Sequence, residues 1–533
     1  MLFHRLQTLN LSLLSAVTSV SACTIQGECV RGDSALQWLS IMLSESAAIS
    51  CKGSPMQAYN KGRYWGEQYG KNATVAVYPC TKYDVSLAVR AADVTPLGRD
   101  LSFVRGGHGM TYASSTTGFM IDLSWLNETR VLHNVTLDDT HVGHVISYEG
   151  GATWEQVYAV TNGSGWIAIG ARDASVGVGG FSTGGGIGFL AGAYGYAVDR
   201  LRAMEVVTMA GDVVLATKTN QHSDLFWALQ GGNGQFGIVT KFWQEAVPEP
   251  EHTEVGIWII ADSSLDLAYS NLETWFTCNK DPYSVVYYAV GYLPAQVVSG
   301  PLGVHTTIVG YHHSNPALNS SQLSFDAIFA PLILGLQLTY ASQRKVRLAE
   351  APALMKPYFP YGYRRGFWGS QTTGVTAAYV KQTSNRFRIY VNHLLARAES
   401  PYSATWVLQY MYPGLNGNLP AFNNDTAWPH ALAGHQTLFS PAWKSSVHDA
   451  ITYHTIAELD SLTSAHQIML DQPLLAEYPN YMSPFSSGYS LFGENMKRLI
   501  DVKSKYDPWC KLHQGRVFAT TACADGGWAN MYP

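Results

Sequence analysis

The alternation of apolar and polar positions early in the chain predicts a strand, a helix and two further strands. Residues 73–77 and 101–104 are short apolar runs bounded by polar residues, as is typical of buried strands. Between them, residues 81–92 have helical spacing and begin with a threonine that can cap a helix. The apolar run at 118–121 predicts the next strand. The segment from 105 to 117 is therefore expected to be a tight connection between two strands.

The same reading extends to the rest of the chain. Residues 146–150 predict a strand and 153–162 a helix, and residues 198–216 alternate as two strands around an Ala-Gly-Asp turn. Further on, the pattern predicts five strands and two helices, the strands at 254–260, 284–292, 306–312, 387–393 and 404–411 and the helices at 263–278 and 441–462. This part is expected to form a second domain, in which helices back an antiparallel sheet.

Composition places the chain among large globular proteins. Its 533 residues can bury a sizeable core and form two or more domains. Hydrophobic residues make up 47% and charged residues 14%, which argues against disorder. The net charge of -5 gives no indication of a nucleic-acid partner or of an anionic membrane surface.

The N-terminus has the pattern of a secretory signal over residues 1–22. His4 and Arg5 precede an apolar stretch, and Val20-Ser21-Ala22 offers a small-x-small cleavage site. The alternative is a buried N-terminal helix, whereas the stretch is too short and too rich in Ser and Thr for a membrane anchor. A secreted or secretory-pathway protein is expected to carry N-glycans on some of its six Asn-x-Ser/Thr sequons, at Asn72, Asn127, Asn134, Asn162, Asn319 and Asn424.

All seven cysteines follow the expected signal, and none forms a Cys-x-x-Cys pair. Disulfides are therefore expected rather than zinc, with at least one cysteine left free. Proximity along the chain suggests the pairs Cys51–Cys80 and Cys510–Cys523. No metal site is expected, because no His-x-x-x-His lies beside an acidic partner on a credible helix.

Two glycine-rich segments stand out as candidate binding loops. Arg105-Gly106-Gly107-His108 presents a histidine at a bend where glycine lets the backbone approach another group closely. Residues 176–188 contain seven glycines interleaved with apolar residues. A low-complexity linker is the alternative, but a linker does not need the apolar positions. Backbone amides free of side chains can surround a pyrophosphate and admit a flat ring system.

These segments, together with two later ones, resemble the berberine-bridge-enzyme-like branch of the vanillyl-alcohol-oxidase (PCMH) type of FAD-binding fold. Arg105-Gly-Gly-His108, Val176-Gly-Val-Gly-Gly180, Asp224-Leu-Phe-Trp-Ala-Leu-Gln-Gly-Gly232 and Phe236-Gly-Ile-Val-Thr240 follow one another in the family's order. Near the C-terminus, Tyr478-Pro-Asn-Tyr481 resembles the family's Tyr-x-Asn-Tyr. The resemblance covers about residues 60–245 and 475–510 and is loose between them.

The resemblance implies FAD bound covalently, through an 8α-histidyl bond to His108; the alternative is a structural turn histidine with FAD bound non-covalently. Many relatives carry a second link from a cysteine at the position of Asp173, so this chain is expected to have one link only. The implied cofactor-binding residues are His108, Arg105, Gly106, Gly107, Gly109, Val176, Gly177, Gly179, Gly180, Ser182, Gly184, Gly185, Gly186, Gly188, Ile238, Val239 and Asn480.

The family's chemistry needs a base that takes a proton as a hydride leaves the substrate. Tyr478 and Tyr194 match family tyrosines near the flavin, and Gln409, Tyr410 and Tyr412 are weaker candidates for lining the pocket. Val176 falls where relatives gate the access of O2, and valine there favours an oxidase.

The expected fold class is α+β, with a two-part PCMH-type FAD-binding domain and a substrate domain that has an antiparallel sheet backed by helices. The expected segments are the signal at 1–22, an N-terminal segment at 23–71, the FAD-binding domain at 72–250, the substrate domain at 251–470 and a returning C-terminal segment at 471–533. The expected function is an oxidase of small specialised metabolites, by alcohol oxidation or oxidative cyclisation, that reduces O2 to H2O2. The alternatives are a carbohydrate oxidase that forms lactones and a flavin-holding scaffold for a non-redox cyclisation.

Overall fold

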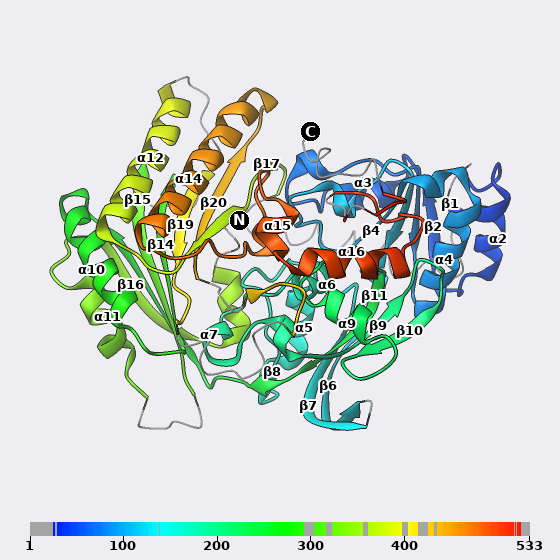
Figure 1. Ribbon diagram of the computed structural model, residues 1–533, viewed down its shortest axis with the longest axis horizontal. Helices are drawn as coiled ribbons and strands as arrows, with labels where there is room; N and C mark the ends of the chain where they lie inside the picture. The colour runs from blue at the N-terminus through cyan, green and yellow to red at the C-terminus, as the bar shows by residue number, and fades with distance from the viewer. Residues whose placement is uncertain are drawn as a thin grey trace, which may run out of the picture.

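The computed structural model describes most of the chain, in the ranges 25–26, 29–137, 139–292, 303–315, 322–354, 356, 361–396, 403–413, 425–430, 434–515, 518 and 520–523. The expected signal peptide, Cys23, Asn319 and Asn424 lie outside these ranges. Two halves lie side by side in Figure 1. The N-terminal elements form one half, and a large sheet with its helices forms the other.

The first sheet has five strands in the order β1-β2-β3-β5-β4. The predicted strand-helix-strand opening is confirmed, because α4 begins after the cap residue Thr81 and connects β3 to β4, and both of these strands pair with β5 in parallel. The elements are β1 (Ile25–Gln26), α2 (Ser34–Met42), β2 (Ala48–Cys51), α3 (Pro55–Lys61), η1 (Glu67–Tyr69), β3 (Val75–Tyr78), α4 (Lys82–Val94), η2 (Pro96–Asp100), β4 (Leu101–Val104), η3 (Tyr112–Ser114), β5 (Phe119–Asp122) and η4 (Leu123–Trp125).

One of the two expected disulfides is wrong. Cys51 pairs with Cys29, across a Cα–Cα distance of 5.7 Å, and Cys80 is free. Proximity along the chain misled here, because the fold places Cys29 beside the end of β2. The pair Cys510–Cys523 is confirmed, and Cys278 is also free.

The second sheet has the order β10-β9-β11-β7-β6, and all its neighbours are antiparallel. The long β6–β7 hairpin extends at the lower edge of Figure 1. The elements are β6 (Thr129–Leu137), β7 (Thr140–Glu149), α5 (Trp154–Thr161), β8 (Trp166–Ile167), α6 (Val178–Thr183), α7 (Ala191–Tyr194), α8 (Ala197–Arg200), β9 (Leu201–Val207), β10 (Val213–Thr217), α9 (Ser223–Leu229), β11 (Ile238–Glu245) and β12 (Val247–Pro248), the last of which pairs with β8.

The third sheet follows the path β16-β13-β15-β14-β19-β20-β17, with β18 also paired to β20. Helices α10, α12 and α14 cover one face of it (Figure 1), and their apolar residues share a core with the strands. The elements are β13 (Thr253–Ile260), η5 (Asp262–Ser264), α10 (Leu265–Cys278), β14 (Ser284–Tyr292), β15 (Val304–His313), α11 (Phe325–Ile333), β16 (Leu338–Val346), η7 (Leu348–Leu354), β17 (Arg364–Arg365), β18 (Trp368–Thr372), α12 (Ala377–Ala396), β19 (Ser403–Gln409), β20 (His435–Trp443), η10 (Ser446–His448) and α14 (Asp449–Met469).

Two expected elements of this half are wrong. The strand predicted at 387–393 is part of the helix α12, in which Phe387, Tyr390, Val391 and Leu394 are buried at helical spacing. The helix predicted at 441–462 begins later, at Asp449, because residues 441–443 complete β20. The other four strands of this half and the helix at 263–278 are confirmed with small shifts of their ends.

The C-terminal segment returns to the first half of the molecule. It contains η11 (Pro479–Tyr481), α15 (Gly488–Phe492) and α16 (Asn495–Tyr506), and α16 contacts α9. In Figure 1 these elements, in red, lie beside the blue and cyan N-terminal ones. None of the helices in the described ranges combines the length and the apolar character that crossing a bilayer requires.

Candidate active site

The two glycine-rich segments found in the sequence touch each other. A Cβ atom on Gly106 would lie 2.4 Å from the backbone nitrogen of Gly177, which is far inside van der Waals contact. Gly107 has φ +68°, a conformation that side-chain-bearing residues rarely adopt. The loop after β4 therefore needs glycine at both positions, and it brings His108 beside the start of the second glycine segment.

His108 is half-buried beside an aromatic and cationic wall. Its ring stacks on Trp65 at a centroid distance of 5.3 Å, and the Trp65 backbone N–H donates to the Gly107 carbonyl. The Arg365 guanidinium lies over the Trp65 ring, 4.7 Å from its centroid. Burial and the positive charge of Arg365 lower the pKa of His108, while Asp173 opposes them. The imidazole is therefore neutral near pH 7.

The Nε2 atom of His108 faces two hydroxyl groups. Ser175 Oγ lies 3.0 Å from it and Tyr361 OH 2.9 Å from it. Ser175 in turn donates to Asp173 Oδ1 at 2.7 Å, and its backbone N–H donates to the same oxygen at 2.9 Å. Asp173, at the position of the family's second flavin link, is thus connected to His108 through Ser175.

The Arg105 side chain connects the His108 loop to the start of α5. Its guanidinium donates to the carbonyl of Gly151 and, at 3.4 Å, to Gln156 Oε1. Gln156 also closes the capping box at the start of α5. The arginine of the predicted motif therefore ties the His108 loop to a helix start of the second sheet.

The second glycine segment folds into the short helix α6 and then a left-handed turn. Gly185 and Gly186 have φ +116° and +82°. The backbone N–H groups of Gly186 and Ile187 both donate to Tyr478 OH at 3.0 Å, and Asn480 Nδ2 donates to the same oxygen at 2.9 Å. Tyr478 and Asn480, predicted from the Tyr-x-Asn motif, thus meet the glycine turn predicted separately.

A second tyrosine of that motif contacts an arginine that the sequence analysis did not single out. Arg172 donates to Tyr481 OH and, at 2.7 Å, to Tyr287 OH. Burial raises the pKa of Tyr287 to about 12 and also raises that of Tyr481, while Arg172 lowers both. Among the described residues Arg172 forms no ion pair, so these phenols are its closest polar partners.

Aromatic contacts join these two groups of residues into one site. Phe367 contacts Trp65 at a centroid distance of 5.6 Å and Tyr481 at 5.0 Å. Tyr481 in turn contacts Tyr478 at 4.6 Å. A continuous aromatic wall therefore runs from His108 to the tyrosines of the Tyr-x-Asn motif.

The large sheet contributes a row of polar side chains in register. Tyr287, Gln409, Gln436 and Gln371 are direct cross-strand partners on β14, β19, β20 and β18. Tyr288 and Leu408, next to Tyr287 and Gln409, belong to the core under the helices, as does Phe439, three positions after Gln436. The row therefore faces the opposite side, where Tyr287 meets Arg172. The Oε1 atoms of Gln409 and Gln436 are buried and, within the described residues, have no hydrogen-bond partner.

Several predicted residues lie at the margin of this arrangement. Tyr194 is half-buried on α7 and contacts Tyr283 at a centroid distance of 6.1 Å. Tyr410 lies on the helix-covered face of the sheet, where its hydroxyl donates to the Asn279 carbonyl. Tyr412 packs between the two cores on either side of the sheet. Tyr194 and Tyr410 are therefore not among the residues joined by the aromatic wall.

The remaining predicted cofactor-binding positions differ in how they are packed. Ser182 is buried and meets Tyr148 OH at 3.0 Å, while Ile238 and Val239 begin β11 with buried side chains. Val176 is half-buried, and its carbonyl accepts the N–H that begins α5. The glycines divide into those whose Cβ would meet other atoms, Gly177, Gly179, Gly184 and Gly188, and those that face open space, Gly109 and Gly180.

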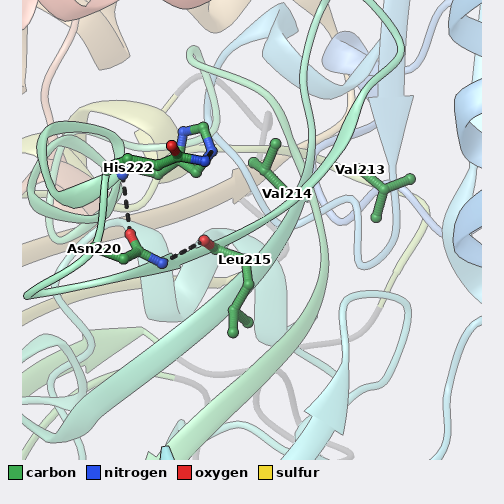
Figure 2. Close-up of a pocket in the computed structure, with 6 residues that line it drawn as sticks. Val213, Val214, Leu215, Asn220 and His222 are labelled. Atoms are coloured by element: carbon green, nitrogen blue, oxygen red, sulfur yellow. Dashed lines mark hydrogen bonds between the residues drawn. The ribbon is translucent and has the colours of Figure 1, made fainter. Parts of the chain in front are cut away.

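A surface hollow of about 470 Å3 lies elsewhere, beside β10 (Figure 2). It is lined by Val213, Val214, Leu215, Asn220, Gln221 and His222. The Asn220 side chain is already bonded within the loop, donating to the Leu215 carbonyl and accepting from the His222 N–H. None of the residues brought together around His108 lines it, so it is not part of this site.

The residues that connect the predicted motifs were not predicted from the sequence. Arg172 and Ser175 lie on either side of Asp173 in the sequence, and Tyr481 ends the Tyr478-Pro-Asn-Tyr481 motif, but nothing in the pattern assigned them a partner. Trp65, Tyr361 and Gln436 carry no local signal. In the part of the chain that the structure describes, no group of three or more His, Cys, Asp or Glu side chains is placed to hold a metal ion.

Comparison with known proteins assigns a family to two stretches. Residues 73–217 match the family described as FAD binding domain, and residues 477–509 match the one described as Berberine and berberine like. These stretches contain the His108 loop, the second glycine segment and the Tyr478–Tyr481 motif.

The similar curated proteins are fungal. The FAD-dependent monooxygenase sdcF of Emericella nidulans is 31% identical over 58% of this chain and 60% of its own length. The FAD-linked oxidoreductase patO of Aspergillus clavatus is 25% identical over 81% of this chain and 73% of its own. The chain thus spans less than two thirds of the first protein and about three quarters of the second.

Solved structures share the fold at low sequence identity. Physcomitrella patens BBE-like 1 has a TM-score of 0.71 at 16% identity, covering 90% of this chain and 97% of its own. Berberine bridge enzyme from Eschscholzia californica has 0.69 at 18%, covering 92% and 99%. A chitooligosaccharide oxidase has 0.66 at 19%, covering 87% and 95%. The predicted α+β fold of the vanillyl-alcohol-oxidase type is confirmed.

Proposed function

We propose that the chain is a berberine-bridge-enzyme-like FAD-linked oxidoreductase, and that it is an oxidase with FAD attached to His108. The observation that carries the proposal is the junction of three separately predicted motifs in one site, with His108 at one end of an aromatic wall and Tyr478 at the other. FAD held there would supply an acceptor at N5 for a hydride from a substrate C–H bond and a route for two electrons to O2, with H2O2 as the product.

The residues present fit that cofactor. Gly109 and Gly180 leave open space where a side chain would stand, and Gly106 and Gly177 let two backbone segments come together. Backbone amides in glycine-rich segments of this kind suit a pyrophosphate. The same residues that the resemblance implied would hold the cofactor through backbone N–H groups rather than through charged side chains.

His108 suits covalent attachment because its ring is neutral and oriented. Burial and Arg365 keep the imidazole unprotonated, and its Nε2 contacts Ser175 and Tyr361. The other ring nitrogen, Nδ1, is the atom that relatives of this family bond to the flavin. With Asp173 at the position of the cysteinyl link, we infer a single bond to FAD.

The substrate is proposed to lie between the aromatic wall and the glutamine row. Gln409 and Gln436 offer two buried amide oxygens that a hydroxyl or N–H group of a substrate would satisfy. Tyr478 is proposed to take the substrate proton. Tyr194 lies outside the aromatic wall, against Tyr283. Val176, beside the His108 loop, is proposed to leave O2 a path to the flavin.

A carbohydrate oxidase is the second candidate, and the glutamine row is the observation that favours it. Amide side chains in a row suit a substrate with several hydroxyl groups, and one solved structure with this fold is a chitooligosaccharide oxidase. The similar fungal oxidoreductases favour a specialised metabolite instead. Oxidation of glucose or cello-oligosaccharides, and not of phenolic or indolic alcohols, would decide for the carbohydrate.

Passage through the secretory pathway is proposed from two observations. The structure contains two disulfides, and the four sequon asparagines within the described ranges, Asn72, Asn127, Asn134 and Asn162, are all exposed. Disulfides form mainly in oxidising compartments. Glycans on these asparagines would show as a mass loss on treatment with an N-glycosidase.

The first experiment is acid precipitation of the full-length protein and of its His108→Ala variant. Yellow colour that stays in the wild-type pellet and moves to the supernatant in the variant is the expected result, because the imidazole is the proposed anchor. Bleaching of the bound flavin by an anaerobic substrate then tests the oxidase reaction. Flavin in neither fraction, with a correctly folded protein, would contradict the proposal.

A further inference from the structure

The network around His108 contains a carboxylate whose role in the site is otherwise unexplained. Asp173 and Ser175 belong to the loop before α6, whereas His108 follows β4, 67 residues earlier than Ser175. Asp173 Oδ1 accepts hydrogen bonds from both the backbone N–H and the hydroxyl of Ser175. Two bonds to one residue fix the serine hydroxyl between the carboxylate and the imidazole.

The direction of these hydrogen bonds determines which nitrogen of His108 carries the proton. A carboxylate only accepts, so the single hydroxyl proton of Ser175 must point to Asp173. Ser175 Oγ is then an acceptor toward Nε2, 3.0 Å away, and the neutral ring must carry its proton there. The lone pair is left on Nδ1.

We propose that Asp173 and Ser175 form a relay that prepares His108 for covalent attachment of FAD. The relay rests on the proposed attachment to His108 and adds the residues that promote it. By fixing the Nε2–H tautomer it presents the Nδ1 lone pair as a nucleophile, and the carboxylate stabilises the positive charge that the ring acquires as Nδ1 forms its bond.

The attachment balances with O2 as the oxidant. A C–N bond forms between Nδ1 and the 8α carbon of the flavin, while one C–H bond at that carbon and the N–H bond at Nε2 break. The Nε2 proton leaves through Ser175 toward Asp173, the other proton goes to solvent, and O2 takes up two electrons and two protons as H2O2. The same oxidant serves the proposed catalytic reaction.

Other groups near His108 do not replace the relay. Tyr361 OH also lies near Nε2 and bonds the same Ser175 hydroxyl, but within the described ranges no carboxylate accepts a hydrogen bond from it. Arg365 is positive and disfavours a charged imidazole. Asp173 is therefore the group that can compensate positive charge on His108. Asp173 occupies the position where relatives place the cysteine of the second flavin link. The residue that rules out a cysteinyl bond would therefore assist the histidyl bond.

The test compares covalent and total flavin in full-length protein secreted from one host. The set is wild type, Asp173→Asn, Asp173→Glu, Ser175→Ala and Tyr361→Phe, with His108→Ala as the reference for no attachment. Acid-insoluble flavin is measured at harvest and after incubation with added FAD, and total flavin and Tm check that each variant still folds and binds the cofactor.

Attachment in Asp173→Asn and Ser175→Ala is expected to slow by about 10- to 100-fold, by analogy with the loss of a group that orients a metal-binding histidine. Asp173→Glu should recover part of the rate. Tyr361→Phe should slow attachment much less than Asp173→Asn, because it removes one contact of Nε2 but leaves Ser175 and Asp173 in place. A purely structural role for Asp173 would instead lower Tm and total flavin together, without rescue by glutamate.

Three outcomes would overturn the relay, and they can be told apart. Asp173→Asn that attaches FAD as fast as the wild type overturns the relay and leaves His108 as the anchor. A wild type whose flavin is wholly released by acid overturns the attachment itself, and the relay with it. A large loss in Tyr361→Phe with none in Asp173→Asn would assign the orienting role to the phenol and also overturn the relay.

Discussion

At the scale of single residues, the hydroxyl of Tyr478 has an unusual set of partners. It accepts hydrogen bonds from the N–H groups of Gly186, Ile187 and Asn480. Burial and the neighbouring Tyr481 raise the pKa of Tyr478 above its usual value, and these three donors offset part of that rise by stabilising the phenolate. A neutral phenol oxygen has only two lone pairs, so three donors suit the anion better. The geometry thus supports Tyr478 as the base that takes the substrate proton.

Replacement of Tyr478 by phenylalanine is expected to lower kcat by about 100-fold or more, within the range that a general base contributes. The flavin should remain covalently bound, since His108 is unchanged. Stopped-flow bleaching of the flavin by substrate measures the step directly. Tyr481→Phe is the matched control, because Tyr481 contacts Arg172 in the same wall. A large loss in Tyr481→Phe alone would transfer the role of base to that residue.

At the scale of elements, the contact between α14 and β18 contains an acidic group that is costly to ionise. Ser370 on β18 donates to Asp460 on α14. Burial, with a smaller effect from the negative charge of Glu477, raises the pKa of Asp460 to about 7. Between its unfolded pKa near 4 and this value, the folded protein holds a proton that the unfolded chain has lost. The free energy of unfolding therefore falls as the pH rises through this window.

Asp460→Asn is expected to remove that fall, because the amide keeps the bond from Ser370 without an ionisable group. Relative to the variant, the wild type should lose about 4 kcal/mol between about pH 4 and 7 and lose little more above it. Urea unfolding across this pH range in both proteins measures the difference. Parallel pH profiles would show that Asp460 ionises in the folded state as it does in the unfolded chain.

At the scale of the whole molecule, a buried ion pair fastens the C-terminal segment to the first half. Lys503 and Asp507 on and after α16 lie 2.7 Å apart, and both side chains are fully buried. Lys503 also donates to the carbonyls of Gln235 and Leu512, and Asp507 accepts the N–H of Leu512. Gln235 lies just before β11, so this cluster joins segments more than 260 residues apart.

Lys503→Met is expected to destabilise the protein by about 3–5 kcal/mol, because it leaves the buried Asp507 carboxylate without its cation. Lys505→Met, two residues along the same helix, is the control. Its ion pair with Asp224 is largely exposed, so its loss should cost no more than about 1 kcal/mol. Chemical unfolding and flavin release on heating measure both. Equal effects of the two substitutions would contradict a special role for the buried pair.

The sequence by itself determined the features that depend on neighbouring residues. Thr81 caps its helix as expected, and the glycines at 106 and 107 form the predicted bend, because these preferences arise from backbone sterics and local hydrogen bonds. The motifs that indicated the fold are likewise short stretches of neighbouring residues. Residues 387–393 show the limit of such reasoning. Their alternation alone suited a strand, whereas the buried positions along the whole of α12 follow a helical period.

Only the tertiary structure decided which distant residues meet. Arg172 reaches Tyr481 across 309 positions, and the Tyr287–Gln436 row exists only because three strands pair in one register. Cys51 pairs with Cys29 rather than with the expected Cys80 because of where β2 ends. Periodicity reports which face of an element is buried, but not what packs against that face. The chemistry proposed for this site depends on such long-range contacts.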